Sequence, residues 1–473
     1  MVRKCVLMAT LVAVMQMILV SAQPALPNGV VLGAVGGVTR TSAVIGFRTQ
    51  SASRVQVVYH VCNNNRQFNT NSPSLQVSGQ TVTTRNNDDL TGSIQLNNLT
   101  PDTRYCYRIR VDGAIQNVPD VYEQMFKTFP SYSTSFEFSV FSDCSNNGEH
   151  DSPARAYVAG GHIGNYDPLF ALQIGDFDHT DPMSIQASRE MHRRVRDTRY
   201  QAGAQFTAHI MTKMALYHIW DDHDYCDNDS DRFCVNKEGA TKAFREYFPG
   251  YPYANPQNGL WYSFRAGPAE LFVVDTRSRR DPGAWPDIAG KSMLDGGNSI
   301  ADDQITWLLN GLRSSSATWK IIVSSTGANQ YARIMTTQDN WTAYRTEAAR
   351  IRQFIETNNL RNIVMISGDI HTGGGIDDGR NSLWGIPEVT VPHTNLQTGW
   401  NIQHVGTWSH GVVSGDNSQR RGEGFVSVAV STRALRIRVC DRDGQAKLTM
   451  TLNARGNVRR RSHGSEGLDE VFP

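Results

Sequence analysis

The hydrophobic pattern of the chain changes near residue 134. Before that point, short stretches with alternating apolar and polar residues are separated by turns rich in Asn, Gly and Ser, and the clearest stretches are 42–48, 54–60 and 105–111. Alternation with a period of two between such turns is typical of half-buried strands. The pattern therefore predicts an all-β unit over residues 27–130.

After residue 134 the apolar runs become continuous and rich in β-branched residues. They cover residues 136–142, 169–175, 214–220, 269–275, 319–325 and 361–368. Strands that are apolar on both sides are covered on both faces, as in layered α/β folds. Helical patterns fall between several of these runs, at 188–196, 241–247, 301–314 and 345–358. We therefore predict an α/β domain over 134–453, closed by a hairpin of strands 425–430 and 434–439.

A local motif refines the prediction for the first unit. Residues 96–110 carry Leu, Pro, Thr and Tyr at the spacing L-x-P-x-T-x-Y. This segment resembles the corner of fibronectin type III modules, in which a Tyr hydroxyl makes a hydrogen bond back to the chain. The resemblance implies a fibronectin III-like β-sandwich over 27–130, for which we expect a scaffolding role.

The two ends of the chain predict its compartment. Arg3 and Lys4 precede an apolar stretch over 6–20, and small residues follow at 20–22. This order is typical of a cleaved secretory signal peptide over 1–22, with an uncleaved signal anchor as the alternative. No other run is long enough to predict a transmembrane segment. The basic, Gly-rich residues 454–473 predict a flexible tail.

Charge and cysteine content add two constraints. The 46 Lys and Arg residues nearly balance the 45 Asp and Glu residues, which argues against a general attraction to nucleic acid or anionic membranes. In a secreted protein, cysteines pair by default. The pairs that sequence position favours are Cys62–Cys106 and Cys226–Cys234. Cys144 and Cys440 remain, and either they pair with each other or Cys144 serves another purpose.

Polar clusters follow the apolar runs of the second unit. They lie at 142–146, 175–179, 221–224, 275–280 and 367–371. Ligands of open α/β sheets bind at the carboxyl ends of the strands, so clusters that are distant in sequence can converge there. Asp and His side chains in this number require cations, because crowded buried carboxylates repel one another. The pattern predicts a metal site at this edge.

The order of these clusters carries a family resemblance. S-D-C-S-N, G-D-x-x-H, W-D-D-H-D, D-T-R-x-x-R and S-G-D-I-H occur in this order. This order is similar to that of the PhoD-like alkaline phosphatases (the alkaline phosphatase D family), within the calcineurin-like metallophosphoesterases. The resemblance spans about residues 30–440 and implies a four-layer αββα sandwich. It also implies two or more metal ions, iron and calcium first, with zinc or another divalent ion as alternatives.

The resemblance also assigns metal ligands. The implied ligands are Asp143, Cys144, Asp176, His179, Asp222, Asp369 and His371. Asp176 matches the residue that bridges two ions. The chain departs from the family at His179, where a Tyr is frequent, and at Asp143, where Ser is common. Cys144 and Asp143 both remain candidates, and Cys144 is preferred.

Four further residues are candidates for catalysis and substrate binding. His223 matches the catalytic His, and its acidic neighbours favour a protonated imidazole that can donate to a leaving alkoxide. Arg277 is assigned to both catalysis and phosphate binding, Arg280 to phosphate binding, and Asn228 to the same substrate site. Bound cations lower the pKa of water, so we expect attack by a metal-bound hydroxide.

These features predict a secreted metal-dependent phosphatase that acts on phosphate monoesters, diesters or both, with phosphate scavenging as its role. Its substrates would be small-molecule, lipid or nucleotide esters, without a stable nucleic-acid complex. One alternative is a phospholipase D-like or nuclease phosphodiesterase. Another, of a different class, is a non-catalytic secreted binding protein that keeps the fold.

Overall fold

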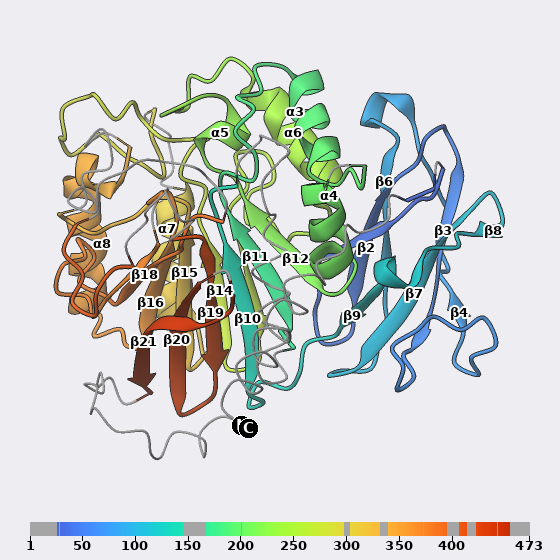
Figure 1. Cartoon of the computed structure of the whole chain (residues 1–473). Coiled ribbons are helices and arrows are strands. Elements are labelled where there is room, and N and C mark those ends of the chain that lie inside the picture. The colour runs from blue at the N-terminus through green and yellow to red at the C-terminus, as the bar shows by residue number, and fades with distance from the viewer. Residues whose placement is uncertain are drawn as a thin grey trace, which may run out of the picture.

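The computed structural model describes residues 26–454, except 28, 145–166, 200, 298–302, 332–338, 372, 395–405, 414–421 and 442 (Figure 1). The predicted signal peptide over 1–22 and the predicted tail beyond residue 454 lie outside the described residues. Within the described part, no helix combines the length and the apolar character needed to cross a lipid bilayer.

A nine-stranded mixed sheet forms one half of the core among the described residues, with strand order β21-β20-β19-β10-β11-β12-β1-β2-β6. Its strands are β1 (Gly33–Gly36), β2 (Ala43–Arg48), β6 (Thr91–Leu96), β10 (Phe136–Phe141), β11 (Phe170–Ile174), β12 (Ala215–Ile219), β19 (Gly424–Val430), β20 (Ala434–Asp441) and β21 (Ala446–Asn453). Strands β10, β11 and β12 run parallel, so their carboxyl ends meet at one edge.

A second sheet of six strands forms the other half, with order β13-β14-β15-β16-β18-β17. Its strands are β13 (Tyr262–Ala266), β14 (Ala269–Val273), β15 (Trp319–Ser324), β16 (Ile363–Ser367), β17 (Gly375–Asp377) and β18 (Glu388–Thr390). The middle strands β14, β15, β16 and β18 are parallel. The predicted apolar runs are therefore strands of these two sheets, as expected from their continuous apolar character.

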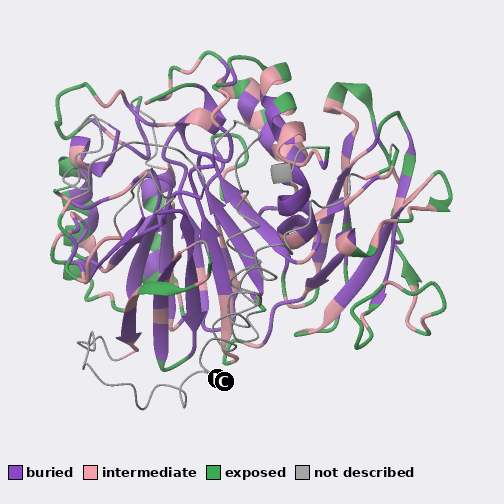
Figure 2. Ribbon diagram, in the orientation of Figure 1, coloured by how far each residue is buried: buried purple, intermediate pink, exposed green. Residues whose placement is uncertain are grey.

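The two sheets pack face to face, and helices cover their outer faces (Figure 1). On β12, Tyr217 stacks on Phe264 of the second sheet with ring centroids 3.9 Å apart, whereas its neighbour His218 stacks on Phe244. Successive side chains of a strand point to opposite faces, so one strand serves two layers. This arrangement agrees with the predicted four-layer α/β architecture, and its strands are almost wholly buried (Figure 2).

Helices occur where the periodicity predicts them, and further helices at 201–206 and 222–225 were not predicted. The described helices are α3 (Ile185–Arg194), α4 (Gln201–Phe206), α5 (Asp222–Tyr225), α6 (Lys237–Tyr247), α7 (Asp303–Ser314) and α8 (Arg345–Thr357). In α7 the buried apolar residues are Ile305, Leu308, Leu309 and Leu312, at the spacing of one helix face. Together with α8, this face packs against the outer side of the second sheet.

The N-terminal part contributes a further small sheet of order β4-β3-β7-β8, with β5 beside β3 and β9 beside β7. Its strands are β3 (Arg54–Val61), β4 (Gln76–Val77), β5 (Val82–Thr83), β7 (Arg104–Val111), β8 (Ala114–Ile115) and β9 (Met125–Lys127). The predicted corner is present, because the Tyr105 hydroxyl accepts a hydrogen bond of 2.8 Å from the N–H of Thr100. The fibronectin III-like classification itself remains a prediction.

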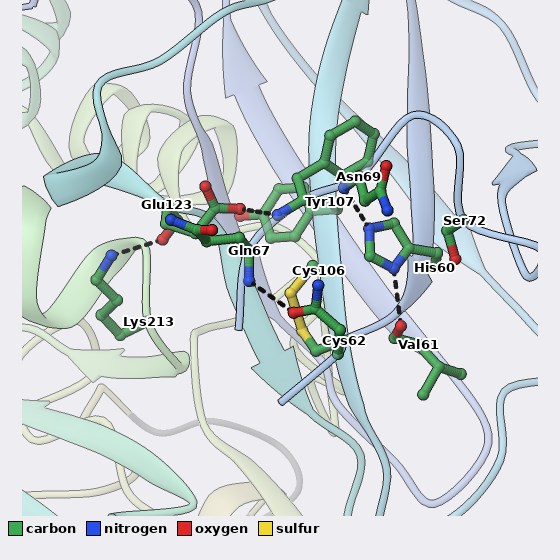
Figure 3. Close-up of a disulfide and its surroundings, with 12 residues drawn as sticks. His60, Val61, Cys62, Gln67, Asn69, Ser72, Cys106, Tyr107, Glu123 and Lys213 are labelled. Atoms are coloured by element: carbon green, nitrogen blue, oxygen red, sulfur yellow. Dashed lines mark hydrogen bonds between the residues drawn. A yellow bond between two sulfur atoms is a disulfide. The ribbon is translucent and has the colours of Figure 1, made fainter. Parts of the chain in front are cut away.

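The boundary near residue 130 joins the two parts more closely than the sequence indicates. Strand β1 lies parallel to β12, with Val35 opposite Ala215, so β1, β2 and β6 extend the large sheet. Lys213 donates to the carbonyl oxygens of Val121 and Glu123, at 3.0 and 2.7 Å. Figure 3 shows the Lys213 contact in the surroundings of the Cys62–Cys106 disulfide.

Both predicted disulfides are present. They join Cys62 to Cys106 and Cys226 to Cys234. Cys144 and Cys440 are buried and free, so the alternative in which they pair with each other is not formed.

Candidate metal centre

Acidic and imidazole side chains converge at the carboxyl edge of both sheets. Asp143 follows β10, Asp176 follows β11, and His223 lies in α5, directly after β12. Asp369 and His371 follow β16 of the second sheet. The sheets bring together clusters that are separated by more than two hundred residues, as expected for ligand sites of α/β folds.

One candidate group contains Asp143, Asp176, Asp369 and His371, whose possible ligand atoms all lie within 4.8 Å of one another. The Nε2 atom of His371 is 3.4 Å from Asp143 Oδ1, 3.4 Å from Asp369 Oδ1 and 3.8 Å from Asp176 Oδ2. Three carboxylates and one imidazole form a mixed oxygen and nitrogen donor set, which suits iron, zinc or a similar ion.

A second candidate group shares Asp176 with the first. It contains Asp176, His179 and His223, also within 4.8 Å. His179 Nε2 lies 3.2 Å from Asp176 Oδ2, and the rings of His179 and His223 have centroids 4.4 Å apart. The Nδ1 atom of His179 is 2.8 Å from the carbonyl oxygen of Cys144, which orients the ring. Asp176 is therefore placed as a bridging residue would be.

The carboxylate of Asp176 is almost fully buried, and no backbone N–H or hydroxyl among the described residues donates to it. Its ion-pair neighbours are His179 and His371. Burial alone raises the pKa of Asp176, but the adjacent imidazoles outweigh burial and hold this pKa well below its usual range. A buried, ionised carboxylate with so few donors is a suitable cation ligand.

The backbone at these ligands is unusual. Asp143, Asp176, Asp369 and His371 have φ angles of 52°, 50°, 56° and 50°. Non-glycine residues seldom adopt this left-handed region, and Asp and Asn do so more readily than most. Such conformations cluster at functional sites, where the surrounding structure enforces them.

The structure reveals a partner of His223 that the sequence did not indicate. The Nδ1 atom of His223 lies 2.5 Å from Oδ1 of Asp181, in the loop after β11. Burial lowers the pKa of His223, but Asp222, Asp176 and the Asp181 hydrogen bond outweigh it, so the pKa is raised above its usual value. Because Nδ1 is in contact with Asp181, Nε2 is the ring nitrogen that could contact a substrate or an ion.

Two carboxylates of the W-D-D-H-D segment orient the backbone. Asp224 accepts hydrogen bonds from the N–H groups of Phe177, Asp178 and Asp221, at 2.6, 3.1 and 3.2 Å. Asp222 accepts from the N–H groups of His223 and Asp229. Asp224 therefore fixes the loop that carries Asp176 against the one that carries His223.

Arg277 is not placed where a phosphate could contact it. Its side chain has no exposed surface, and it donates to Asp221 and to both carboxylate oxygens of Asp339 at 2.6 and 2.9 Å. Burial opposes the charge, but Asp221, Asp222 and Asp339 keep the pKa of Arg277 well above its usual value. The geometry gives Arg277 a positioning role that balances three acidic side chains, in place of the predicted phosphate contact.

The other two residues predicted to bind substrate, Arg280 and Asn228, differ in their exposure. Arg280 is also buried and contacts the Tyr344 hydroxyl at 2.8 Å and Asp339 at 2.8 Å, so it too belongs to the ion-pair network. Asn228 is exposed on the loop between Cys226 and Cys234. Its role in substrate binding remains a prediction.

Cys144 lies beside the centre, but none of the candidate groups found in the described part of the chain includes its sulfur. Burial raises the pKa of its thiol well above the usual value. Its role as a ligand therefore remains a prediction, whereas Asp143 is in a candidate group. His393 is buried nearby, with Ser142 opposite it in a β-bridge.

An additional all-carboxylate group lies next to the centre. Asp222, Asp229 and Asp339 lie within 4.8 Å of one another, as do Asp176, Asp221 and Asp222. Asp229 and Asp339 were not predicted, because neither follows an apolar strand. The signal that could have found Asp229 is its position three residues after Cys226, inside a short disulfide loop that follows His223 directly.

Two packed sheets with outer helices and a carboxylate–imidazole cluster at one edge define a metallophosphoesterase-like α/β fold. The structure of PhoD has this fold, with a TM-score of 0.65, 18% identity and 92% of each chain covered. The purple acid phosphatase PPD1 of yellow lupin (Lupinus luteus) has it too, with a TM-score of 0.61 and 13% identity over 90% of this chain and 74% of the other. These likenesses concern the fold.

Part of the chain also matches a family model and a curated relative. Residues 173–398 match the model of the PhoD-like phosphatases, which confirms the predicted resemblance. Alkaline phosphatase D of Bacillus subtilis (strain 168) is 27% identical over 203 residues, which cover 38% of this chain and 34% of that protein. The chain thus spans about a third of the length of this curated relative.

Proposed function

We propose that the protein is a metal-dependent phosphoesterase that hydrolyses phosphate monoesters, diesters or both. The observation that carries this proposal is the position of Asp176 in two adjacent candidate groups, with its buried oxygens facing imidazoles. A carboxylate shared by two groups is what a two-ion site requires. The family match over residues 173–398 supports the same reaction class.

The residues present fit bound cations. Asp143, Asp369 and His371 would hold one ion with Asp176, and His179 would hold the neighbouring ion from the other side of Asp176. Imidazole donors favour iron or zinc, and the adjacent all-carboxylate group favours calcium. When bound, two such ions supply the positive charge that a phosphate ester needs and lower the pKa of water.

The side chains of the protein then divide the remaining work. Asp181 holds Nδ1 of His223, and Nε2 remains outside that contact, so His223 can deliver a proton to a leaving alkoxide. Asp224 fixes the backbone on which Asp176 and His223 are carried. Arg277 pairs with Asp221, Asp222 and Asp339 and acts to lower the pKa of each carboxyl group, although burial still leaves the pKa values of Asp221 and Asp222 raised.

The physiological setting is part of the proposal. The predicted signal peptide and the two disulfides support secretion, and a secreted phosphoesterase would release phosphate from extracellular esters. A phospholipase D-like or nuclease activity would use the same centre on a different ester. A non-catalytic binding protein is disfavoured, because it would gain nothing from burying Asp143, Asp176 and Asp221 together.

Turnover of p-nitrophenyl phosphate and of bis(p-nitrophenyl) phosphate, combined with metal analysis, tests the proposal. We expect turnover of at least one ester, loss of turnover on chelation, and bound metal in the purified protein. Asp176→Asn should lose both metal and turnover, and His223→Ala should lower kcat by about 10²- to 10⁴-fold with metal retained. Asp120→Asn, an exposed change on the N-terminal part, should behave as the wild type.

Metal-free protein, or turnover of neither ester with metal bound, would contradict the proposal. The ratio of monoester to diester rates assigns the substrate class. A role for His223 as a metal ligand, in place of a proton donor, would show as metal loss in His223→Ala.

A further inference from the structure

Exposed apolar side chains are concentrated around the candidate centre. Nine large apolar side chains among the described residues are exposed, and five of them lie on three loops at the carboxyl edge. These five are Met183, Phe233, Val235, Trp285 and Ile288, with exposed fractions of 49%, 58%, 79%, 45% and 63%. We call these five residues the apolar rim. Clustered exposed apolar residues on a soluble protein mark an interaction surface.

The most prominent part of the rim is the loop over 284–290, in which every residue is exposed (Figure 2). Its sequence is Ala-Trp-Pro-Asp-Ile-Ala-Gly, so Asp287 is its single charged residue. The carboxylate of Asp287 is turned back to the N–H of Thr346, at 3.2 and 3.3 Å. The outward face of the loop is therefore apolar, led by Trp285 and Ile288.

This loop is held firmly, although it is exposed. Lys291 is buried and donates to the carbonyl oxygens of Gly283, Trp285 and Ala343, at 2.7, 2.8 and 2.9 Å. These three hydrogen bonds hold the ammonium group of Lys291 inside the loop, so it adds no positive charge to the exposed surface. An exposed Trp on a braced loop loses little conformational entropy when it docks.

The disulfide loop carries the second part of the rim. Cys226–Cys234 closes this loop, and Phe233 lies 6.1 Å from the Trp285 ring. The guanidinium of Arg232 lies over both rings and pairs with Asp281 at 2.8 Å. The two loops therefore form one surface, and its one central cation already has a counter-charge.

The rim borders the mouth of the candidate centre. The N–H of Arg232 donates to the carbonyl of Arg280, and the N–H of Asp229, on the same disulfide loop, donates to Asp222 at 2.7 Å. Met183 follows Asp181, the partner of His223, by two residues. A surface docked on the rim would therefore lie beside the candidate centre.

The charges around the rim select the kind of surface. The exposed or half-buried carboxylates that remain on these loops are Asp227 and Asp231, while Asp181 is paired with His223 and the cations Arg232 and Lys291 are engaged. Acidic flanks repel an anionic surface and attract an ammonium-bearing one. Trp and Phe are also the side chains that settle at the level of lipid headgroups.

We propose that the apolar rim is a docking surface for zwitterionic lipid layers, with choline- or ethanolamine-type headgroups against its acidic flank. Docking presents the candidate centre to phosphate esters that lie at the lipid–water interface. Binding to the lipid layer stands independently of turnover, whereas a preference for interfacial esters rests on the proposed function.

Co-sedimentation of the metal-loaded protein with phosphatidylcholine vesicles tests the rim. We expect binding that falls by about tenfold or more in a Trp285→Ser/Ile288→Ser variant, because two exposed apolar side chains no longer enter the interface. The matched control is Val61→Ser/Val77→Ser, which removes two exposed apolar side chains from the N-terminal part and should bind like the wild type. Turnover of water-soluble p-nitrophenyl phosphate should be equal in all three proteins.

Equal vesicle binding by the rim variant and the wild type would overturn the inference, as would absence of binding by the wild type. Stronger binding to phosphatidylglycerol than to phosphatidylcholine vesicles would overturn the headgroup assignment. A wild-type dimer that becomes monomeric in the rim variant, measured by analytical ultracentrifugation, would assign the rim to a second copy instead. Rim-dependent vesicle binding without turnover of any ester would contradict the proposed function and would still support the rim as a lipid-docking surface.

Discussion

At the scale of single residues, the partner of His223 is the finding that changes the chemistry most. Asp222 and Asp224, its neighbours in sequence, bond to backbone N–H groups. Asp181, from another loop, holds the imidazole instead. A carboxylate bonded to one ring nitrogen fixes the tautomer and raises the pKa of the other.

Asp181→Asn tests this pairing. The amide carries no charge, so we expect the pKa of His223 to fall and the basic limb of the pH–rate profile to move to lower pH, because less imidazole is protonated. We also expect kcat to fall by about tenfold with KM little changed, measured with p-nitrophenyl phosphate. Asp227→Asn, an exposed change near the same entrance, should leave the profile unchanged. An unaltered profile for Asp181→Asn would remove Asp181 from the mechanism.

The sequence indicates candidate site residues where a polar cluster directly follows an apolar strand. The strand-end positions of Asp143, Asp176 and His371 could be read from apolar runs followed by polar clusters. Arg277 could not be assigned correctly, because the sequence does not show that Asp339, sixty-two residues later, lies against its guanidinium. An arginine near a phosphate site and an arginine that neutralises carboxylates have the same sequence signature.

At the scale of elements, long apolar runs and amphipathic helices were placed to within a few residues. Strands β1 and β21 are among those that escaped prediction. Strand β1 has the sequence Gly-Ala-Val-Gly, which is too short and has side chains too small to give a strand signal. The small residues are needed because the side chains of Tyr107 and Tyr251 pack against the two glycines. Strand β21 alternates Leu448, Met450 and Leu452, and this signal could have extended the predicted hairpin to three strands.

Helix α8 carries a buried carboxyl group that makes stability depend on pH. Burial raises the pKa of Glu347 from 4.5 to about 7, although the Ser292 hydroxyl and the Met293 N–H donate to it. Between these pH values the native state keeps a proton that the unfolded chain releases. The free energy of unfolding therefore falls as the pH rises from about 4.5 to about 7, by about 3 kcal/mol from this group.

Glu347→Gln removes that proton equilibrium. We expect the free energy of unfolding of the variant, relative to that of the wild type, to be higher at pH 7.5 than at pH 5, by up to about 3 kcal/mol. Urea unfolding at the two pH values measures this change. Glu356→Gln, on the exposed side of the same helix, should show the same difference at both pH values. A pH-independent effect of Glu347→Gln would mean that Glu347 is ionised in the native state.

At the scale of the whole molecule, the change in pattern near residue 134 predicts an all-β unit and an α/β unit, but it does not reveal how the two are joined. Strand β1 has too little sequence signal to reveal that it pairs with β12. The Tyr217 hydroxyl also contacts the backbone of Val38. Removal of the N-terminal part would expose the edge of β12 and leave apolar surface open to water.

We therefore expect the two parts to unfold together. All nine Trp residues follow residue 219, so Trp fluorescence reports only on the α/β part, whereas calorimetry reports on the whole chain. The calorimetric trace should show one peak whose midpoint coincides with the fluorescence transition. A separate calorimetric peak without a change in fluorescence would show that the N-terminal part unfolds on its own.

The left-handed backbone at Asp143, Asp176, Asp369 and His371 bears on how this protein would evolve. Each such residue costs on the order of 1 kcal/mol or more relative to glycine, which adopts this conformation freely. Glycine at any of these positions would relax the backbone and remove a candidate ligand in the same step. Directed evolution for thermal stability alone would therefore favour variants that are stable but inactive. Stabilised variants should be assayed for turnover at every round of selection.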